Sequence, residues 1–247
     1  MASVEQQRQA GVLTLSMQRP EKKNALDQAM YQQLADALKE AATDPGVKVV
    51  LLQGQDDCFT AGNDLQDFLT GGELNQQHPT VRFLYQLAEF PKPIVAAVAG
   101  LAIGIGTTAL LHCELVYATA DTRFQLPFTR LGLCPEAASS LLLPQLIGYH
   151  RACEYLLLAE PFDGETAERM GLVNRLVPKA ELLAFANEKA RQLAALPAQA
   201  VQTSKRLLKA NQQEALHYTL REELNEFQQL LQSDECKQAV QQFFRRG

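Results

Sequence analysis

The sequence lacks the cysteine and histidine spacings that are typical of metal sites and disulfide frameworks. Its five cysteines include no CxxC pair, and its four histidines show no metal-ligand spacing. An odd number of unpaired cysteines is typical of a reduced compartment rather than of a disulfide-stabilised secreted protein. We therefore expect no metal and a cytoplasmic location.

The chain also lacks the charge excess and the apolar segments that would direct it to nucleic acid or membranes. Its net charge of −5 argues against general nucleic-acid binding. The first residues contain no apolar segment of the signal-peptide kind, so we expect no signal peptide. The longest apolar stretch, residues 94–111, contains glycines and threonines and is typical of strand, turn and helix rather than of a membrane span. The last residues do not form a peroxisomal SKL-type tail.

The apolar residues that are present predict an α/β fold. The chain has 247 residues, of which 47% are hydrophobic, enough for a substantial core. Strand-like runs at 11–17, 48–54, 94–98 and 114–118 are interspersed with helical periodicity, as in the segment that follows Asp27, a predicted N-cap. The chain becomes mostly helical from about residue 136. We divide it into a core of residues 1–197 and a C-terminal helical region of residues 198–247.

Two glycine-containing segments, residues 58–65 (the first corner) and residues 100–106 (the second corner), are the most informative features. Each follows an apolar run that predicts a buried strand, and each leads into a predicted helix. Glycine permits a positive φ or a close approach of the backbone, and a helix start leaves N–H groups without intrahelical partners. If the two corners converge, their N–H groups form an oxyanion hole, which stabilises developing negative charge.

Each corner also has another interpretation. Residues 61–64 could form only a tight turn with an Asx cap. Residues 104–109 fit the G-x-G-x-x-A fingerprint of dinucleotide-binding proteins, and Asp121 follows the next predicted strand. That fingerprint normally opens its fold, whereas two strands and a helix precede it here. It also leaves the first corner unexplained.

Glu136 has two interpretations as well. After Pro135 it could be an ordinary acid in the first turn of a helix. Alternatively, its carboxylate is surrounded by apolar residues, and burial there would raise its pKa and make it a stronger base. The apolar neighbours in the sequence are Leu131, Leu133, Leu141 and Leu142.

Taken together, the two corners and the segments 19–26 and 167–173 resemble the crotonase (enoyl-CoA hydratase/isomerase) superfamily, from about Val12 to the C-terminus. The resemblance implies an α/β spiral of ββα units with C-terminal helices that trimerise, as a homotrimer or a dimer of trimers. It implies an acyl-coenzyme A thioester as substrate and no separate cofactor. The thioester oxygen would lie between the N–H groups of Asn63 and Ile105. The substrate-binding residues would be Lys22, Lys23, Ala61, Gly62, Asn63, Asp64, Leu65, Gly104 and Phe128.

Departures from the family pattern indicate the reaction. Hydratases in this family carry two glutamates, and the matching positions here are Thr108 and Phe128, neither of which can activate water as a carboxylate would. Residues 128–140 instead resemble the peroxisomal-type Δ3,Δ2-enoyl-CoA isomerases of fatty-acid β-oxidation. In that group the glutamate aligned with Glu136 is the catalytic base. The alternatives are another crotonase-type enzyme, such as a hydratase, and an acyl-CoA-binding protein without turnover.

An isomerase of this kind would transfer a proton from C2 to C4 of a 3-enoyl-CoA through a thioester dienolate. The catalytic residues would be Glu136, Asn63 and Ile105. Several apolar residues suit the lining of an acyl-chain site, although most of them could equally belong to the core. They are Phe59, Phe68, Phe83, Leu84, Leu101, Phe128 and Leu133.

Overall fold

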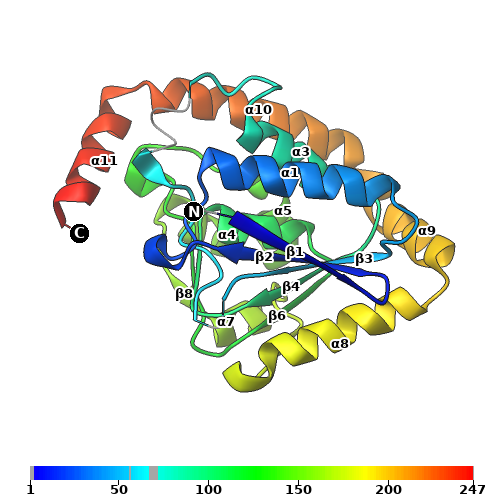
Figure 1. Cartoon of the computed structure of the whole chain (residues 1–247). Coiled ribbons are helices and arrows are strands. Elements are labelled where there is room, and N and C mark those ends of the chain that lie inside the picture. Colours follow the sequence, from blue (N-terminus) through cyan, green and yellow to red (C-terminus); the bar gives the residue numbers. More distant parts are fainter. Residues whose placement is uncertain (1–2, 56, 67–71, 247) are drawn as a thin grey trace.

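The computed structural model describes residues 3–55, 57–66 and 72–246, and its strands form two sheets (Figure 1). The larger sheet has the order β1-β2-β3-β4-β6-β9, and the smaller has the order β5-β7-β8. Among the described strands, the pairs β1-β2 and β7-β8 are antiparallel and the others are parallel. The strands are β1 (Ser3–Gln9), β2 (Val12–Gln18), β3 (Val49–Gln53), β4 (Ile94–Val98), β5 (Leu101–Ile103), β6 (Leu115–Ala118), β7 (Arg123–Gln125), β8 (Phe162–Asp163) and β9 (Arg175–Leu176).

Helices surround the sheets and make up most of the second half of the chain. They are α1 (Gln28–Thr43), α3 (Pro79–Glu89), α4 (Ile105–Thr108), α5 (Ser139–Ile147), α6 (Tyr149–Leu157), α7 (Gly164–Arg169), α8 (Leu182–Ala195), α9 (Ala198–Lys209), α10 (Gln213–Leu231) and α11 (Asp234–Arg246). Short 3₁₀ turns are η1 (Pro20–Lys22), η2 (Ala109–His112), η3 (Thr129–Leu131), η4 (Lys179–Glu181) and η5 (Ala210–Gln212). None of the helices in the described part of the chain has the length and hydrophobicity that a bilayer crossing needs.

Most of the predicted elements are confirmed. The four predicted strands correspond to β2, β3, β4 and β6, and the helix after Asp27 is α1. The Asp27 side chain accepts a hydrogen bond from the Met30 N–H at 2.9 Å, as an N-cap does. Strand β1 was not predicted, because its residues after Val4 are polar and exposed. It forms through antiparallel pairing with β2 rather than through an apolar pattern of its own.

Alternate residues of the central strands build two separate hydrophobic layers. Val49 and Leu51 of β3 pack in the cluster that contains α8, and Val50 and Leu52 pack in the cluster that contains α1 and α3. The larger sheet therefore has helix α8 on one face and helices α1 and α3 on the other (Figure 1). Burial on both faces explains why β3 is a continuous apolar run.

The chain repeatedly leaves the larger sheet, adds a strand to the smaller sheet and then enters a helix. Strand β4 leads through Gly100 into β5 and then into α4, and β6 leads into β7. Gly100 has a φ of +66°, and a Cβ there would lie 1.8 Å from the Asp57 carbonyl oxygen, so this turn requires glycine. The arrangement confirms the predicted α/β spiral of ββα units.

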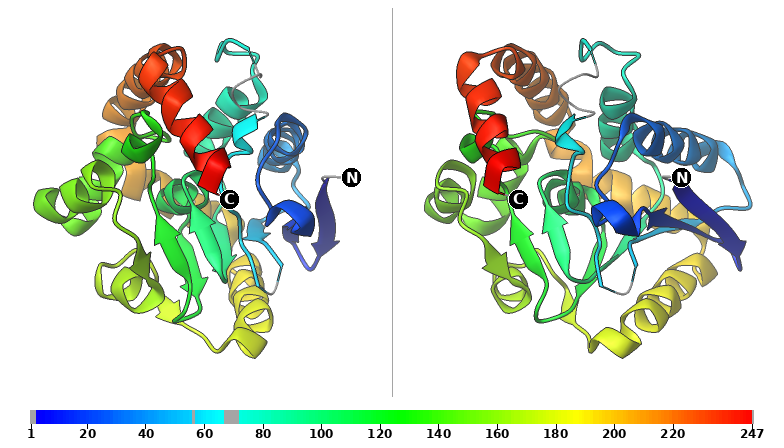
Figure 2. Two further views of the ribbon diagram at one scale, coloured as in Figure 1. Left: turned by 90° about the vertical axis from the view of Figure 1, so that its left-hand side faces the viewer. Right: turned by 60° about the vertical axis from the view of Figure 1, so that its left-hand side comes forward.

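The four helices from α8 to α11 form the C-terminal part of the chain. Helix α10 packs against α5, and α11 packs against the η3 turn, so the end of the chain returns to the smaller sheet (Figure 2). Helix α9 begins at Ala198, where the predicted C-terminal region starts. The division into residues 1–197 and 198–247 remains a prediction.

Candidate active site

The two glycine corners lie side by side. The Thr60 N–H donates to the Leu101 carbonyl oxygen at 2.8 Å, and the Ile103 N–H donates to the Thr60 carbonyl oxygen at 3.1 Å. Gly62 has a φ of +90°, and a Cβ at this position would lie 2.7 Å from the Ile103 carbonyl oxygen. A Cβ at Gly106 would lie 2.6 Å from Cγ2 of Thr60. The close contact between the corners therefore depends on these glycines.

The corners leave two backbone N–H groups free. Leu26 donates to the Gly62 carbonyl oxygen and accepts from the Asp64 N–H, so it pairs with the residues on either side of Asn63. In a parallel bridge of this kind, the N–H of the middle residue points away from the partner strand. Ile105 is the first residue of α4, where an N–H has no intrahelical acceptor. Among the described residues, neither the Asn63 nor the Ile105 N–H has a hydrogen-bond acceptor.

Gly104 sets the start of α4. It has a φ of +55°, its N–H donates to the Gln125 carbonyl oxygen, and its own carbonyl oxygen accepts from the N–H groups of Thr107 and Thr108. The structure disfavours the dinucleotide-binding alternative for residues 104–109. Helix α4 has only four residues, and Gly106 is covered by Thr60 of the other corner.

A cavity of about 650 Å³ opens beside the two corners. Its wall includes eight of the predicted substrate-binding residues: Lys22, Ala61, Gly62, Asn63, Asp64, Leu65, Gly104 and Phe128. Lys23 is not among the residues that line this cavity, although its carbonyl oxygen accepts from the Ala61 N–H at 2.9 Å. The lining also includes Arg123, Leu133, Phe227, Phe243 and Phe244, so β7, α10 and α11 contribute to the cavity.

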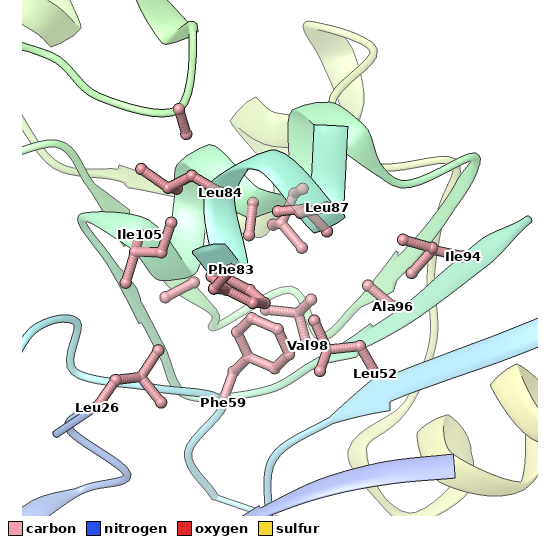
Figure 3. Packing of buried hydrophobic residues seen from close by; sticks show 14 of the residues in the cluster. Leu26, Leu52, Phe59, Phe83, Leu84, Leu87, Ile94, Ala96, Val98 and Ile105 are labelled. Atoms are coloured by element: carbon pink, nitrogen blue, oxygen red, sulfur yellow. The ribbon is translucent and has the colours of Figure 1, made fainter. Parts of the chain in front are cut away.

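The predicted apolar lining belongs only in part to this cavity. Phe128 and Leu133 line it, whereas Leu101 does not. Phe59 and Phe83 are 1% and 2% exposed and lie in the middle of the core, which favours the core interpretation that the sequence also allowed for them (Figure 3). The same applies to Leu84, which is 1% exposed and packs in the same cluster. Phe68 lies outside the described residues.

Glu136 does not begin a helix, contrary to the first interpretation of the sequence. It lies in the loop before α5, which starts three residues later at Ser139. Ala137 and Ala138 have φ values of +57° and +55°, and this left-handed backbone separates Glu136 from the helix. The Glu136 side chain is buried, and Thr108 Oγ1 donates to its Oε1 at 3.0 Å.

The environment of Glu136 favours a strong base. Burial raises the pKa of Glu136 to about 8, the Thr108 hydrogen bond opposes this increase, and the negative charge of Glu223 adds to it. Thr108 lies one helical turn after Ile105, so Glu136 is adjacent to the helix that carries one of the free N–H groups. Neither Glu136 nor Ile105 is among the residues that line the cavity, and both are buried.

Tyr31 links the first corner to the surroundings of Glu136, and the sequence analysis missed it. Its hydroxyl donates to Oδ1 of Asn63. Burial, and then the charge of Glu136, raise the pKa of the Tyr31 phenol, so it remains a hydrogen-bond donor. Tyr31 lies on the apolar face of α1 beside Met30 and Leu34, and in the sequence it therefore looks like a core residue.

Two further buried groups hold the loop after Glu136. His112 Nε2 donates to the Ala137 carbonyl oxygen at 2.8 Å, and burial lowers the pKa of His112 to about 4, so the ring is neutral at pH 7. Glu223 of α10 accepts from the Ala138 N–H at 2.6 Å. The signal for Glu223 was available, because an acidic residue occurs on an apolar stripe at helical spacing. The other members of this stripe are Leu216, Leu220 and Phe227.

Comparisons with known proteins identify the family and agree with the fold. The family model described as "Enoyl-CoA hydratase/isomerase" matches residues 7–247. The solved structure of Pseudomonas aeruginosa OdaA is 46% identical, with a TM-score of 0.95 over 97% of this chain and 98% of that one.

Two curated relatives carry different activities in their names. Enoyl-CoA delta isomerase 2 of Rattus norvegicus is 34% identical over 96% of this chain, which spans 62% of that relative's length. The 2,3-dehydroadipyl-CoA hydratase of Escherichia coli K12 is 32% identical over 97% of this chain and 94% of its own length. The matches over nearly the whole chain place this protein in the enoyl-CoA hydratase/isomerase family.

Proposed function

We propose that the protein is a Δ3,Δ2-enoyl-CoA isomerase, which moves the double bond of a 3-enoyl-CoA to the 2-position. The observation that supports this proposal most strongly is that the carboxylate of Glu136 is buried beside the two convergent corners. At the two positions where hydratases of this family carry glutamates, the chain has Thr108 and Phe128. A single strong base, with no carboxylate at either of these two positions, suits proton transfer within the substrate better than addition of water.

In the proposed reaction, the thioester oxygen accepts hydrogen bonds from the N–H groups of Asn63 and Ile105. The acyl chain lies near Leu133, which lines the cavity. Glu136 removes a proton from C2, which leaves a dienolate whose negative charge lies on the thioester oxygen. The protonated Glu136 then returns the same proton to C4, which gives the conjugated 2-enoyl-CoA and regenerates the carboxylate.

Water addition is the second candidate, because a hydratase is among the relatives. Incubation with a 3-enoyl-CoA and, separately, with a 2-enoyl-CoA distinguishes the two. Isomerisation predicts that the conjugated thioester accumulates from the first substrate and that the second remains unhydrated. A 3-hydroxyacyl-CoA as the main product would favour the hydratase. Tight binding of both esters with turnover of neither would favour an acyl-CoA-binding protein.

The activity should depend on the ionisation of Glu136. Only the carboxylate can accept the C2 proton, and the pKa of Glu136 is raised to about 8. We therefore expect kcat/KM for the 3-enoyl-CoA to increase with pH up to about 8 and then to level off. The measurement is a pH profile at saturating and at low substrate. An acid limb near 4.5, the ordinary pKa of glutamate, would contradict the buried-base assignment.

Thr108 should tune this base. In Thr108→Val the shape is retained and the hydrogen bond to the Glu136 carboxylate is lost, so we expect the acid limb of the pH profile to move up by about one unit. At pH 7 this corresponds to a loss of about tenfold in kcat/KM. Thr108→Ser, which retains the hydroxyl, is the matched control and should stay near wild type. An unchanged profile in a folded valine variant would show that this hydrogen bond does not act on the base.

The assembly is part of the same proposal. Helices α9 and α10 expose Leu207, Leu208 and Tyr218, which supports a homotrimer or a dimer of trimers formed through the C-terminal helices. Sedimentation analysis of the purified protein tests the assembly, since a monomer would contradict it.

We also propose a cytoplasmic setting, which the five free cysteines support, and a reaction without a separate cofactor.

A further inference from the structure

The turn that carries Glu136 has an unfavourable backbone that needs support from elsewhere. Ala137 and Ala138 both have left-handed φ values, and for residues other than glycine this conformation costs about 1–2 kcal/mol each. Such strain persists only where surrounding contacts enforce it. Because α5 starts directly afterwards, a left-handed residue precedes helical ones, and successive N–H groups then form a concave anion-binding surface.

The carboxylate of Glu223 occupies this concave surface. Its Oε2 accepts from the Ala138 N–H at 2.6 Å, and its Oε1 accepts from the Ser140 N–H at 2.9 Å and from the Ser140 hydroxyl. Three donors therefore converge on one side chain, which is only 7% exposed. Burial raises the pKa of Glu223, and the hydrogen bonds from Ser140 and Ala138 oppose this increase because they favour the carboxylate. Hydrogen bonds to an ionised acceptor are stronger than neutral ones, so the carboxylate form can hold the strained turn.

The other groups around Glu136 carry no charge that could replace that of Glu223. Thr108 of α4 and Tyr31 of α1 are hydroxyl donors, and His112 of η2 is neutral at pH 7. On the loop itself, burial raises the pKa of the Cys134 thiol to about 12, so it also stays uncharged. Among the described groups, Glu223 is the one that acts on Glu136 through its charge.

We propose that Glu223 is a positioning residue for Glu136, because its carboxylate holds the turn that aims Glu136. The negative charge of Glu223 acts on Glu136 in addition. This inference rests on the proposed isomerase function for its kinetic consequences. A like charge nearby disfavours ionisation, which makes Glu136 bind a proton more tightly once it has taken it from C2. Because both carboxyl groups are buried, their titrations are linked.

Glu223→Gln tests both parts, because it retains the volume of the side chain but removes the charge and turns a donor toward the N–H groups. We expect kcat to fall about 100-fold, since small displacements of a catalytic group have effects of this size. We also expect the pKa of Glu136 to fall by about one unit. Glu222→Gln is the matched control, because it removes the same charge from an exposed neighbour on the same helix and should leave both quantities unchanged.

Two readouts keep this test separate from the test of the function. The acid limb of the kcat/KM profile reports the base during turnover, and ¹³C NMR titration of the glutamate carboxyls reports Glu136 without any turnover. A wild-type protein that does not isomerise 3-enoyl-CoA would contradict the proposed function, while the NMR titration would still test the effect of Glu223. A purely structural role predicts a lower Tm with the Glu136 pKa unmoved.

The proposal is overturned if folded Glu223→Gln keeps kcat within about threefold and the Glu136 pKa unchanged. Should this variant fail to fold, Ser140→Ala takes its place, because it removes one of the three donors and leaves the Glu223 charge. We then expect kcat to fall by about fivefold or more, while the acid limb of the pH profile stays unchanged. A wild-type kcat in Ser140→Ala would contradict the positioning role.

Discussion

Glu136→Gln is expected to lower kcat for isomerisation by about 10³–10⁴-fold, because the proposed mechanism uses this carboxylate as both the base and the acid. Glutamine has the same shape and still accepts the hydrogen bond from Thr108, so the turn should keep its conformation. The measurement is the rate at which a 3-enoyl-CoA becomes the conjugated ester, compared under saturating substrate. Turnover near the wild-type rate in a folded variant would remove Glu136 from the mechanism.

The stability of the same variant provides an independent control. The pKa of Glu136 is about 8 in the folded protein and 4.5 in an ordinary environment, so the folded state binds more protons between these values. Stability of the wild type therefore declines as the pH rises from about 4.5 to about 8, by a few kcal/mol at most. Glu136→Gln lacks this decline. Its Tm should exceed that of the wild type at pH 8 and should match it near pH 4.

Gly62→Ala is expected to lower kcat/KM by about 10²–10³-fold, the effect of losing one oxyanion-hole donor. The added Cβ would lie 2.7 Å from the Ile103 carbonyl oxygen, which belongs to backbone and cannot rotate away. The corner must therefore move, and the N–H of Asn63, the next residue, moves with it. Steady-state kinetics with the 3-enoyl-CoA, together with thermal unfolding, measure the two consequences.

Gly72→Ala separates steric contact from backbone strain. Gly72 has a φ of +89°, almost the same as Gly62, but among the described residues a Cβ there would meet no heavy atom within 4 Å apart from those of Gly72 and its chain neighbours. This variant should lose about 1 kcal/mol of stability from the left-handed backbone and should retain its activity. If Gly62→Ala behaved in the same way, the contact between the two corners would not matter for catalysis.

The sequence predicted the elements of the fold that local patterns of apolar residues indicate. Strands β3 and β4 are buried on both faces, so their apolar runs were sufficient to identify them. The two corners were predicted for a similar reason, since their glycines follow buried strands and mark close approaches of the backbone. Strand β1 is exposed and polar after Val4, and pairing with β2 creates it. Its formation depends on a partner strand rather than on its own composition.

The residues that hold the site in position were harder to predict than the groups that would react. Tyr31 and Glu223 lie on apolar stripes of amphipathic helices, where a polar residue resembles an imperfect core position. Their partners are distant in the sequence, since Tyr31 and Asn63 are 32 positions apart and Ala138 and Glu223 are 85 positions apart. The interpretation that placed Glu136 in the first turn of a helix was wrong, because α5 starts at Ser139. Glu223 of α10 accepts from the N–H groups of Ala138 and Ser140 at the start of α5, and no local pattern reveals these contacts.

The distance along the chain between Ala138 and Glu223 has a consequence for biosynthesis. A ribosome delivers the chain from its N-terminus, so both glycine corners leave the exit tunnel before the residues of α10 have been joined. The two corners can then pack together while the turn at Ala137 and Ala138 still lacks the Glu223 carboxylate that holds it. We therefore expect the turn that carries Glu136 to be completed late in synthesis, when α10 docks on the nascent core.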